Sequence, residues 1–173
     1  KATRKITKAM RRVPAAKVRR AQEAAENARP YTERFNAVMA GLASAAAGSD
    51  SASKLLSGTG SDQTHLLVVM TAERGLCGGF NTNIAKLART KAQALVAAGK
   101  TVKILTACTK GRDPLKRDFE SHFVGHVDMT AVNNVGYAAA HNVSIDLLRR
   151  FDSRVFDFPT ILLSPLQHVV TQI

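Results

Sequence analysis

The sequence has few cysteines, few aromatic residues and no long apolar run, and each shortage excludes a class of protein. Its 173 residues include two cysteines, which cannot build a disulfide framework and do not have the C-x-x-C spacing of a zinc site. No apolar run approaches the ~18 residues that a membrane-spanning helix needs. We therefore expect a globular protein of a reducing compartment, with one core of ordinary size.

Acidic residues are also scarce. The chain has 13 Asp and Glu against 25 Lys and Arg, a net charge of +12. Residues 1–35 hold eleven Lys and Arg but only three Glu, so they carry +8 of this excess. A basic segment of this kind suits nucleic acid, an anionic membrane surface or an acidic protein partner, or it is simply a solvated helix face. Charge alone leaves these alternatives open.

Residues 1–46 favour one long helix, because Ala, Lys, Arg, Gln and Glu dominate them. A helix of this length measures about 69 Å, and its apolar seam needs a second long helix that the rest of this chain does not offer. Pro14 and Pro30 each remove one helical hydrogen bond, so we expect a kink at these points or two or three shorter helices. The seam has steps of three and four, as in a coiled coil: Ile6, Met10, Val13, Ala21, Ala24, Ala28, Tyr31, Phe35, Val38 and Leu42.

Residues 47–63 are rich in Ser, Gly, Ala and Asp and predict a mobile linker or surface loop. Strand and helix patterns alternate over residues 64–173, which predicts a Rossmann-like, mostly parallel α/β domain after the coiled-coil-type helix. The run at 65–72 is continuously apolar, as in a strand buried on both faces. We expect further strands over 101–108, 123–129 and 158–163, a ragged final segment over 168–173, and helices over 83–98, 113–119 and 132–151.

The stretch RGLCGGFN, residues 74–81, is a glycine-rich turn between a predicted strand and a predicted helix, where many proteins hold phosphate. Its glycines at 75, 78 and 79 do not match the G-x-G-x-x-G fingerprint of dinucleotide sites. A tight turn that uses positive φ explains them without a ligand. Cys77 is a candidate nucleophile at a helix N-terminus, but no Cys/His or Ser/His/Asp arrangement accompanies it. We predict no catalytic, cofactor-binding or metal site.

Several of these stretches resemble the gamma subunit of rotary (F-type) ATP synthase, in a form similar to alphaproteobacterial sequences. They are KATRKITKAM (1–10), AAKVRRAQ (15–22) and TAERGLCGGFN (71–81), with shorter matches at 84–89, 123–128 and 151–157. The resemblance covers nearly all of the chain outside the linker. It implies that the N-terminal helix pairs with a long C-terminal helix in a left-handed antiparallel coiled coil. It also implies that this chain lacks that C-terminal helix and the extreme N-terminus.

The resemblance further implies a central rotor shaft, which couples proton-driven rotation of a membrane ring to conformational change at the catalytic beta subunits. The implied partners are three alpha and three beta subunits, the epsilon subunit and the rotor c-ring, around a single copy of this chain. The implied location is peripheral, on the cytoplasmic face of the bacterial inner membrane. Catalysis is implied to lie on beta, so we expect this chain to bind no cofactor and no nucleic acid.

In the family the shaft runs past acidic loops of the beta subunits, and the glycine turn lies near them. The alternative function is that of a basic α/β nucleic-acid-binding protein. Against it, Tyr31 and Phe35 are the only aromatic residues among the first 64, so the basic segment lacks interleaved aromatics. The candidate partner contacts that the resemblance implies are Lys5, Lys8, Met10, Arg11, Arg12, Arg74, Gly75, Leu76 and Cys77.

Overall fold

The structure, a computed structural model, describes residues 2–46, 49, 52–132 and 136–164, with side chains from residue 17 onward. The chain divides into two compact units. One holds the helices α1 (Ala2–Ala46) and α2 (Lys54–Ser57), and the other spans Gly58–Ser164. Helix α2 lies inside the segment predicted to be a linker.

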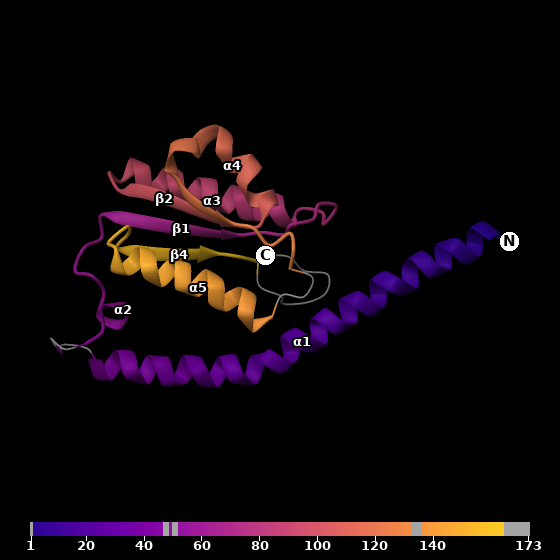
Figure 1. The fold of residues 1–173 in the computed structure, drawn as a ribbon, viewed down its shortest axis with the longest axis horizontal. Coiled ribbons are helices and arrows are strands. Elements are labelled where there is room, and N and C mark those ends of the chain that lie inside the picture. The colour runs from indigo at the N-terminus through magenta and orange to yellow at the C-terminus, as the bar shows by residue number, and fades with distance from the viewer. Residues whose placement is uncertain (1, 47–48, 50–51, 133–135, 165–173) are drawn as a thin grey trace. The chain divides into compact units, whose positions relative to one another are not determined.

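Helix α1 is continuous and carries an exposed apolar seam. It runs through Pro14 and Pro30 without a break. The sequence predicts that the prolines either kink one helix or divide it into shorter helices, and the division does not occur. Each proline lacks one N–H, but the other hydrogen bonds of the helix continue, and the ribbon bends along its course (Figure 1). The second half of the seam is between 49% and 73% exposed, at Tyr31, Phe35, Val38 and Leu42.

The second unit is built on a four-stranded sheet in the order β3-β2-β1-β4, in which every neighbouring pair is parallel. This confirms the predicted α/β fold class. The strands are β1 (Thr64–Met70), β2 (Thr101–Ala107), β3 (Phe123–Val127) and β4 (Phe158–Leu162). The helices are α3 (Phe80–Ala97), α4 (Arg112–Phe119) and α5 (Tyr137–Asp152), with short 3₁₀ turns at Thr109–Gly111 and Glu120–His122.

Several predicted boundaries differ from the structure. Helix α3 begins at Phe80 rather than at residue 83, and strand β3 ends at Val127 rather than at residue 129. Helix α5 begins at Tyr137 rather than at residue 132, because a turn follows β3: the Thr130 N–H donates to the Asp128 carboxylate and the Val132 N–H to the Met129 carbonyl. Strand β1 ends at Met70 rather than at residue 72, since the chain then enters the glycine turn. The predicted final segment, 168–173, lies outside the described residues.

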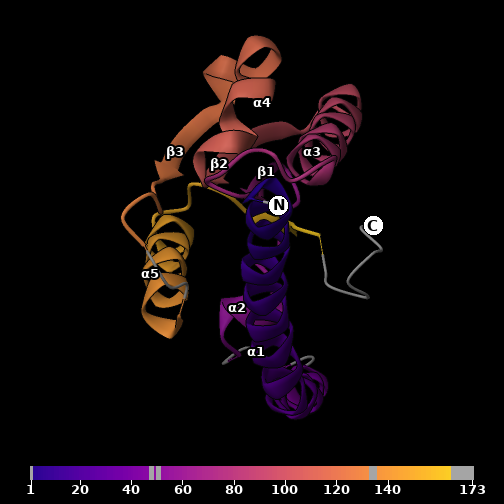
Figure 2. The same ribbon diagram turned by 90° about the vertical axis from the view of Figure 1, so that its right-hand side faces the viewer.

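The core is split between the two faces of the sheet, which Figures 1 and 2 show covered by α3 and α4 on one side and by α5 on the other. Leu67 and Val69 of β1 pack with the α3 and α4 side chains, whereas Leu66 and Val68 pack with Phe151 of α5. The four β1 side chains are fully buried. This confirms a central strand buried on both faces. Small side chains let α3 approach the sheet closely, at Ala85, Ala88 and Ala92.

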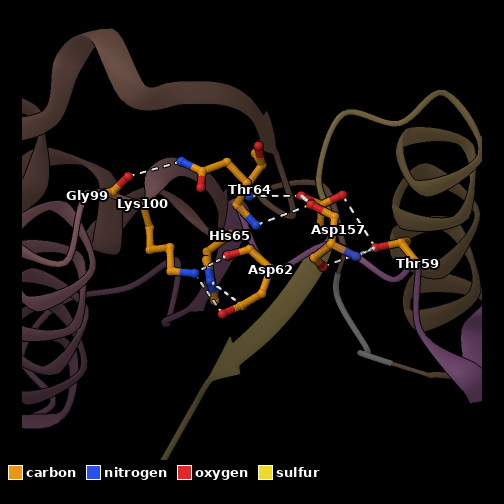
Figure 3. A network of polar contacts seen from close by, with 9 residues as sticks. Thr59, Asp62, Thr64, His65, Gly99, Lys100 and Asp157 are labelled. Carbon is orange, nitrogen blue, oxygen red and sulfur yellow. Dashed lines mark hydrogen bonds and ion pairs between the residues drawn. The ribbon is translucent and has the colours of Figure 1, made fainter.

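Polar contacts at the amino edge of the sheet fix the end of the linker segment (Figure 3). The Asp157 carboxylate, just before β4, accepts hydrogen bonds from the Thr64 N–H and the Ser61 hydroxyl, both at 2.9 Å. Lys100 Nζ lies 2.8 Å from Asp62 Oδ2, and the buried His65 places its Nε2 2.8 Å from the other Asp62 oxygen. Three strands are therefore tied together where they begin.

The hydrogen bonds from Thr64 and then Ser61 hold the pKa of the Asp157 carboxyl below its ordinary value. A carboxyl with a lowered folded-state pKa contributes stability above its unfolded pKa of about 4, and this stability is lost as pH falls through the folded pKa. We expect Asp157→Asn to lower stability at pH 7 and to flatten the loss of stability between about pH 5 and pH 2. Urea unfolding followed by circular dichroism across this range measures both effects.

Asp152→Asn is the matched control, because the Asp152 side chain is exposed at the end of α5. It should leave the pH profile close to that of the unaltered protein. Superimposable profiles for Asp157→Asn and the unaltered protein would contradict the assignment.

Candidate partner-contact site

The glycine turn projects from the carboxyl edge of the sheet, between β1 and α3. Leu76 stands at its tip with its side chain fully exposed, at 109% of the reference area, and with a φ of 59°. A left-handed backbone at a leucine is strained, because Cβ crowds the following carbonyl oxygen. Gly78 adopts a φ of 60°, so a conformational need explains this glycine without a bound phosphate. The tip thus displays a large apolar side chain on a tightly turned backbone.

Asn81, in the first turn of α3, fastens both sides of the turn. Its Oδ1 accepts from the Ala72 N–H at 2.9 Å, and its Nδ2 donates to the Arg74 carbonyl at 3.4 Å and to Cys77 Sγ at 3.1 Å. One side chain therefore closes a loop that spans residues 72–81. Sequence reasoning missed this role, although an asparagine directly after G-G-F was a visible signal for a loop-closing amide.

Glu73 lies behind the turn and faces inward. Its carboxylate accepts from the Met129 N–H at 2.9 Å and from the Thr109 N–H at 3.0 Å, and the Thr109 hydroxyl also donates to it. Burial opposes ionisation, but the hydrogen bonds from Thr109 and Met129 outweigh it and lower the pKa of Glu73. The prediction from sequence included its neighbour Arg74 and missed Glu73, because its partners are 36 and 56 residues away in the chain.

The outer side of the turn is cationic. Arg74 is exposed, and its side chain makes no hydrogen bond or ion pair with any part of the chain that the structure describes. Lys110, after β2, approaches the same turn. If Gly75 carried a Cβ, that atom would lie 4.0 Å from Cε of Lys110. The nearest carboxylate in sequence, Glu73, is engaged inward. An acidic partner would therefore meet Arg74 and Lys110 without first displacing an internal ion pair.

The two groups of predicted contacts lie on different units. Arg74, Gly75, Leu76 and Cys77 lie together on the turn, as described above. The other group, Lys5, Lys8, Met10, Arg11 and Arg12, lies in the first turns of α1, where the backbone is helical and the side chains are outside the described part of the structure. Farther along α1, the described seam has an open hollow lined by Pro30, Tyr31, Arg34, Phe35 and Val38.

The described residues contain no group of three or more His, Cys, Asp and Glu placed to hold a metal ion. Both cysteines are free thiols. Burial, followed by the charge of Glu73, raises the pKa of Cys108 to about 11, so this thiol is neutral at pH 7 and is no nucleophile. Within the described ranges no helix has the length and apolar character needed to cross a bilayer.

The fold and these surfaces define a class of protein: a doubly wound parallel α/β domain and a long helix whose described apolar seam is exposed. A family model described as ATP synthase matches residues 1–173. The ATP synthase gamma chains of Ruegeria pomeroyi and Ruegeria sp. strain TM1040 are 66% and 69% identical over the whole chain. The chain therefore belongs to the ATP synthase gamma-chain family, and its similarity to these alphaproteobacterial relatives agrees with the expected resemblance.

The chain spans 60% of the length of these two relatives. Among solved structures, the central stalk and c-ring of the mitochondrial ATP synthase from Tetrahymena thermophila contains a chain of the same fold. The TM-score is 0.72 at 22% sequence identity, over 97% of this chain and 69% of that chain. This likeness supports the α/β fold and the long helix.

The strain at Leu76 is directly testable. We expect Leu76→Gly to be more stable than Leu76→Ala by about 0.5–1 kcal/mol, because glycine adopts positive φ freely and neither variant loses packing at an exposed tip. Urea unfolding of the two variants measures the difference. The same pair at Leu87, exposed on the regular helix α3, should show the opposite order, since glycine is unfavourable within a helix. Equal stabilities at position 76 would mean that the turn is unstrained.

Proposed function

We propose that this protein is the central rotor-shaft subunit of an ATP synthase, which couples proton-driven rotation of a membrane ring to conformational change at the catalytic beta subunits. Full-length similarity to gamma chains supports the proposal. The observation that carries it beyond family membership is the exposed seam of α1 from Tyr31 to Leu42, which fits a second long helix. The proposed partners are three alpha and three beta subunits, the epsilon subunit and the c-ring, around one copy of this chain.

The chain is proposed to act mechanically, with catalysis on the beta subunits and no cofactor of its own. Its location would be peripheral, on the cytoplasmic face of the inner membrane. A shaft must hold its own helices firmly but release each stationary subunit in turn. Exposed ion pairs suit the second task, since each contributes only about 0–1 kcal/mol. The exposed Arg74 and Lys110 side chains are placed for such contacts with an acidic surface.

Affinity isolation of the tagged full-length subunit from solubilised membranes tests the assembly. We expect a complex whose intact mass and chain composition correspond to one copy of this subunit with three alpha and three beta subunits. Recovery of the subunit alone would contradict the rotor proposal. Recovery with nucleic acid that high salt releases would favour the basic nucleic-acid-binding alternative.

The role of the turn is tested by charge reversal. We expect Arg74→Glu to lower the rate of ATP synthesis per assembled complex by roughly two- to fivefold, because a favourable exposed contact becomes a repulsion of similar size. Membrane vesicles energised by an imposed proton gradient provide the measurement. Arg149→Glu, the same charge change at an exposed position of α5, is the control and should leave the rate unchanged. Equal rates for both variants and the unaltered complex would exclude Arg74 as a partner contact.

A further inference from the structure

One carboxylate joins three strand ends at the carboxyl edge of the sheet. Glu73 follows β1, and its hydrogen-bond donors follow two further strands of the sheet. Thr109 comes after β2, and Met129 comes after β3. The Thr109 hydroxyl donates to the same carboxylate. Glu73 directly precedes Arg74, so the restraint on its side chain acts at the start of the glycine turn.

We propose that Glu73 is the positioning residue of the turn, which fixes the direction in which Arg74 and Leu76 project toward a partner. This inference rests on the proposed contact function of the turn. Glu73 itself makes no contact with the partner, because both oxygens of its carboxylate accept hydrogen bonds from within the unit. Arg74 and Leu76 make the contacts with the partner, and Glu73 holds the backbone that carries them in place.

Backbone strain on both sides of Glu73 supports the need for such a restraint. Cys108 has φ 75° and ψ 145°, a region that residues other than glycine rarely occupy, and it directly precedes the Thr109 donor. Leu76, three residues beyond Glu73, is also left-handed. Strained conformations of this kind persist where surrounding contacts over-determine them, and they cluster at functional positions. The hydrogen bonds of Glu73 supply such contacts between the two strained segments.

Close packing also links the two loops. A Cβ built on Gly111, just after the Thr109 donor, would lie 2.7 Å from the Thr71 side chain at the end of β1. The loop after β2 therefore presses against the chain that leads into the glycine turn. Since both loops are in contact and share the Glu73 carboxylate, loosening one displaces the other.

Glu73→Gln tests the proposal because it keeps the shape of the side chain but replaces one acceptor oxygen with a donor NH₂ group. At least one of the backbone donors, on Thr109 or Met129, then faces another donor. Cys77 reports on the turn, since its Sγ accepts from Asn81 inside the closed loop. We expect the rate of Cys77 labelling by a small thiol reagent in the purified full-length subunit to rise roughly tenfold, as for loss of a hydrogen bond to a charged group. Peptide-resolved mass spectrometry separates Cys77 from Cys108.

Asp157→Asn is the matched control. Asp157 is also a carboxylate that accepts from a backbone N–H and a hydroxyl, but it lies at the amino edge, about 20 Å away along the strands. It should destabilise the unit and leave Cys77 labelling unchanged. Glu73→Asp keeps both oxygens on a shorter stem and should restore labelling toward the rate of the unaltered protein. Thr109→Val removes one donor and should raise labelling less than Glu73→Gln.

Three outcomes separate this inference from the proposed function. If Cys77 labelling in Glu73→Gln matches the unaltered protein, or rises equally in Asp157→Asn, Glu73 does not position the turn. If labelling rises only in Glu73→Gln and ATP synthesis falls as in Arg74→Glu, both proposals are supported. If labelling rises but neither variant alters ATP synthesis in assembled complexes, Glu73 orders the turn and the contact function of the turn is wrong.

Discussion

Burial of β1 on both faces is the constraint from which the rest of the α/β unit follows. Four consecutive side chains, Leu66 to Val69, are fully buried, and each contributes about 2 kcal/mol relative to exposure. Alternate residues point to opposite faces, so neither face can be left to solvent. Helices must therefore cover both sides, and helical crossovers between neighbouring strands make those strands parallel. All loops then fall at two edges, one where strands begin and one where they end.

At each edge of the sheet, one carboxylate accepts hydrogen bonds from backbone N–H groups at strand ends, but the segments that are held differ. Strand ends leave backbone N–H groups that need acceptors. At the amino edge Asp157 supplies them, and the contacts tie the chain leaving the first unit to the sheet. At the carboxyl edge Glu73 supplies them, and the segment held there is a turn that carries an exposed leucine and an exposed arginine. The first edge stabilises the unit, and the second presents a surface.

Local patterns in the sequence were sufficient for the fold and for the location of the turn, because they depend on periodicity and composition. The continuous apolar run at β1 and the glycines after it are both legible from neighbouring residues. The partners of Glu73 were not, since Thr109 and Met129 become neighbours only after β2 and β3 align. The start of α5 was placed too early because apolar spacing continued into a turn that Asp128 stabilises. The sequence leaves the continuity of α1 through Pro14 and Pro30 open, because the helix-breaking effect of a proline is local, whereas the hydrogen bonds that offset it extend over 45 residues.

The two exposed surfaces differ in the strength of contact that they can provide, and this difference suits the rotating shaft proposed above. Apolar side chains at helical spacing, such as Tyr31, Phe35 and Val38, each gain one to a few kcal/mol when a second helix covers them, so such a pairing is permanent. A cationic turn gains far less from each exposed ion pair and releases its partner readily. A weak contact transmits force at a defined angle only if its own geometry is rigid. Under the proposed function, the restraint of the turn by Asn81 and Glu73 matters more than the strength of any contact that Arg74 makes.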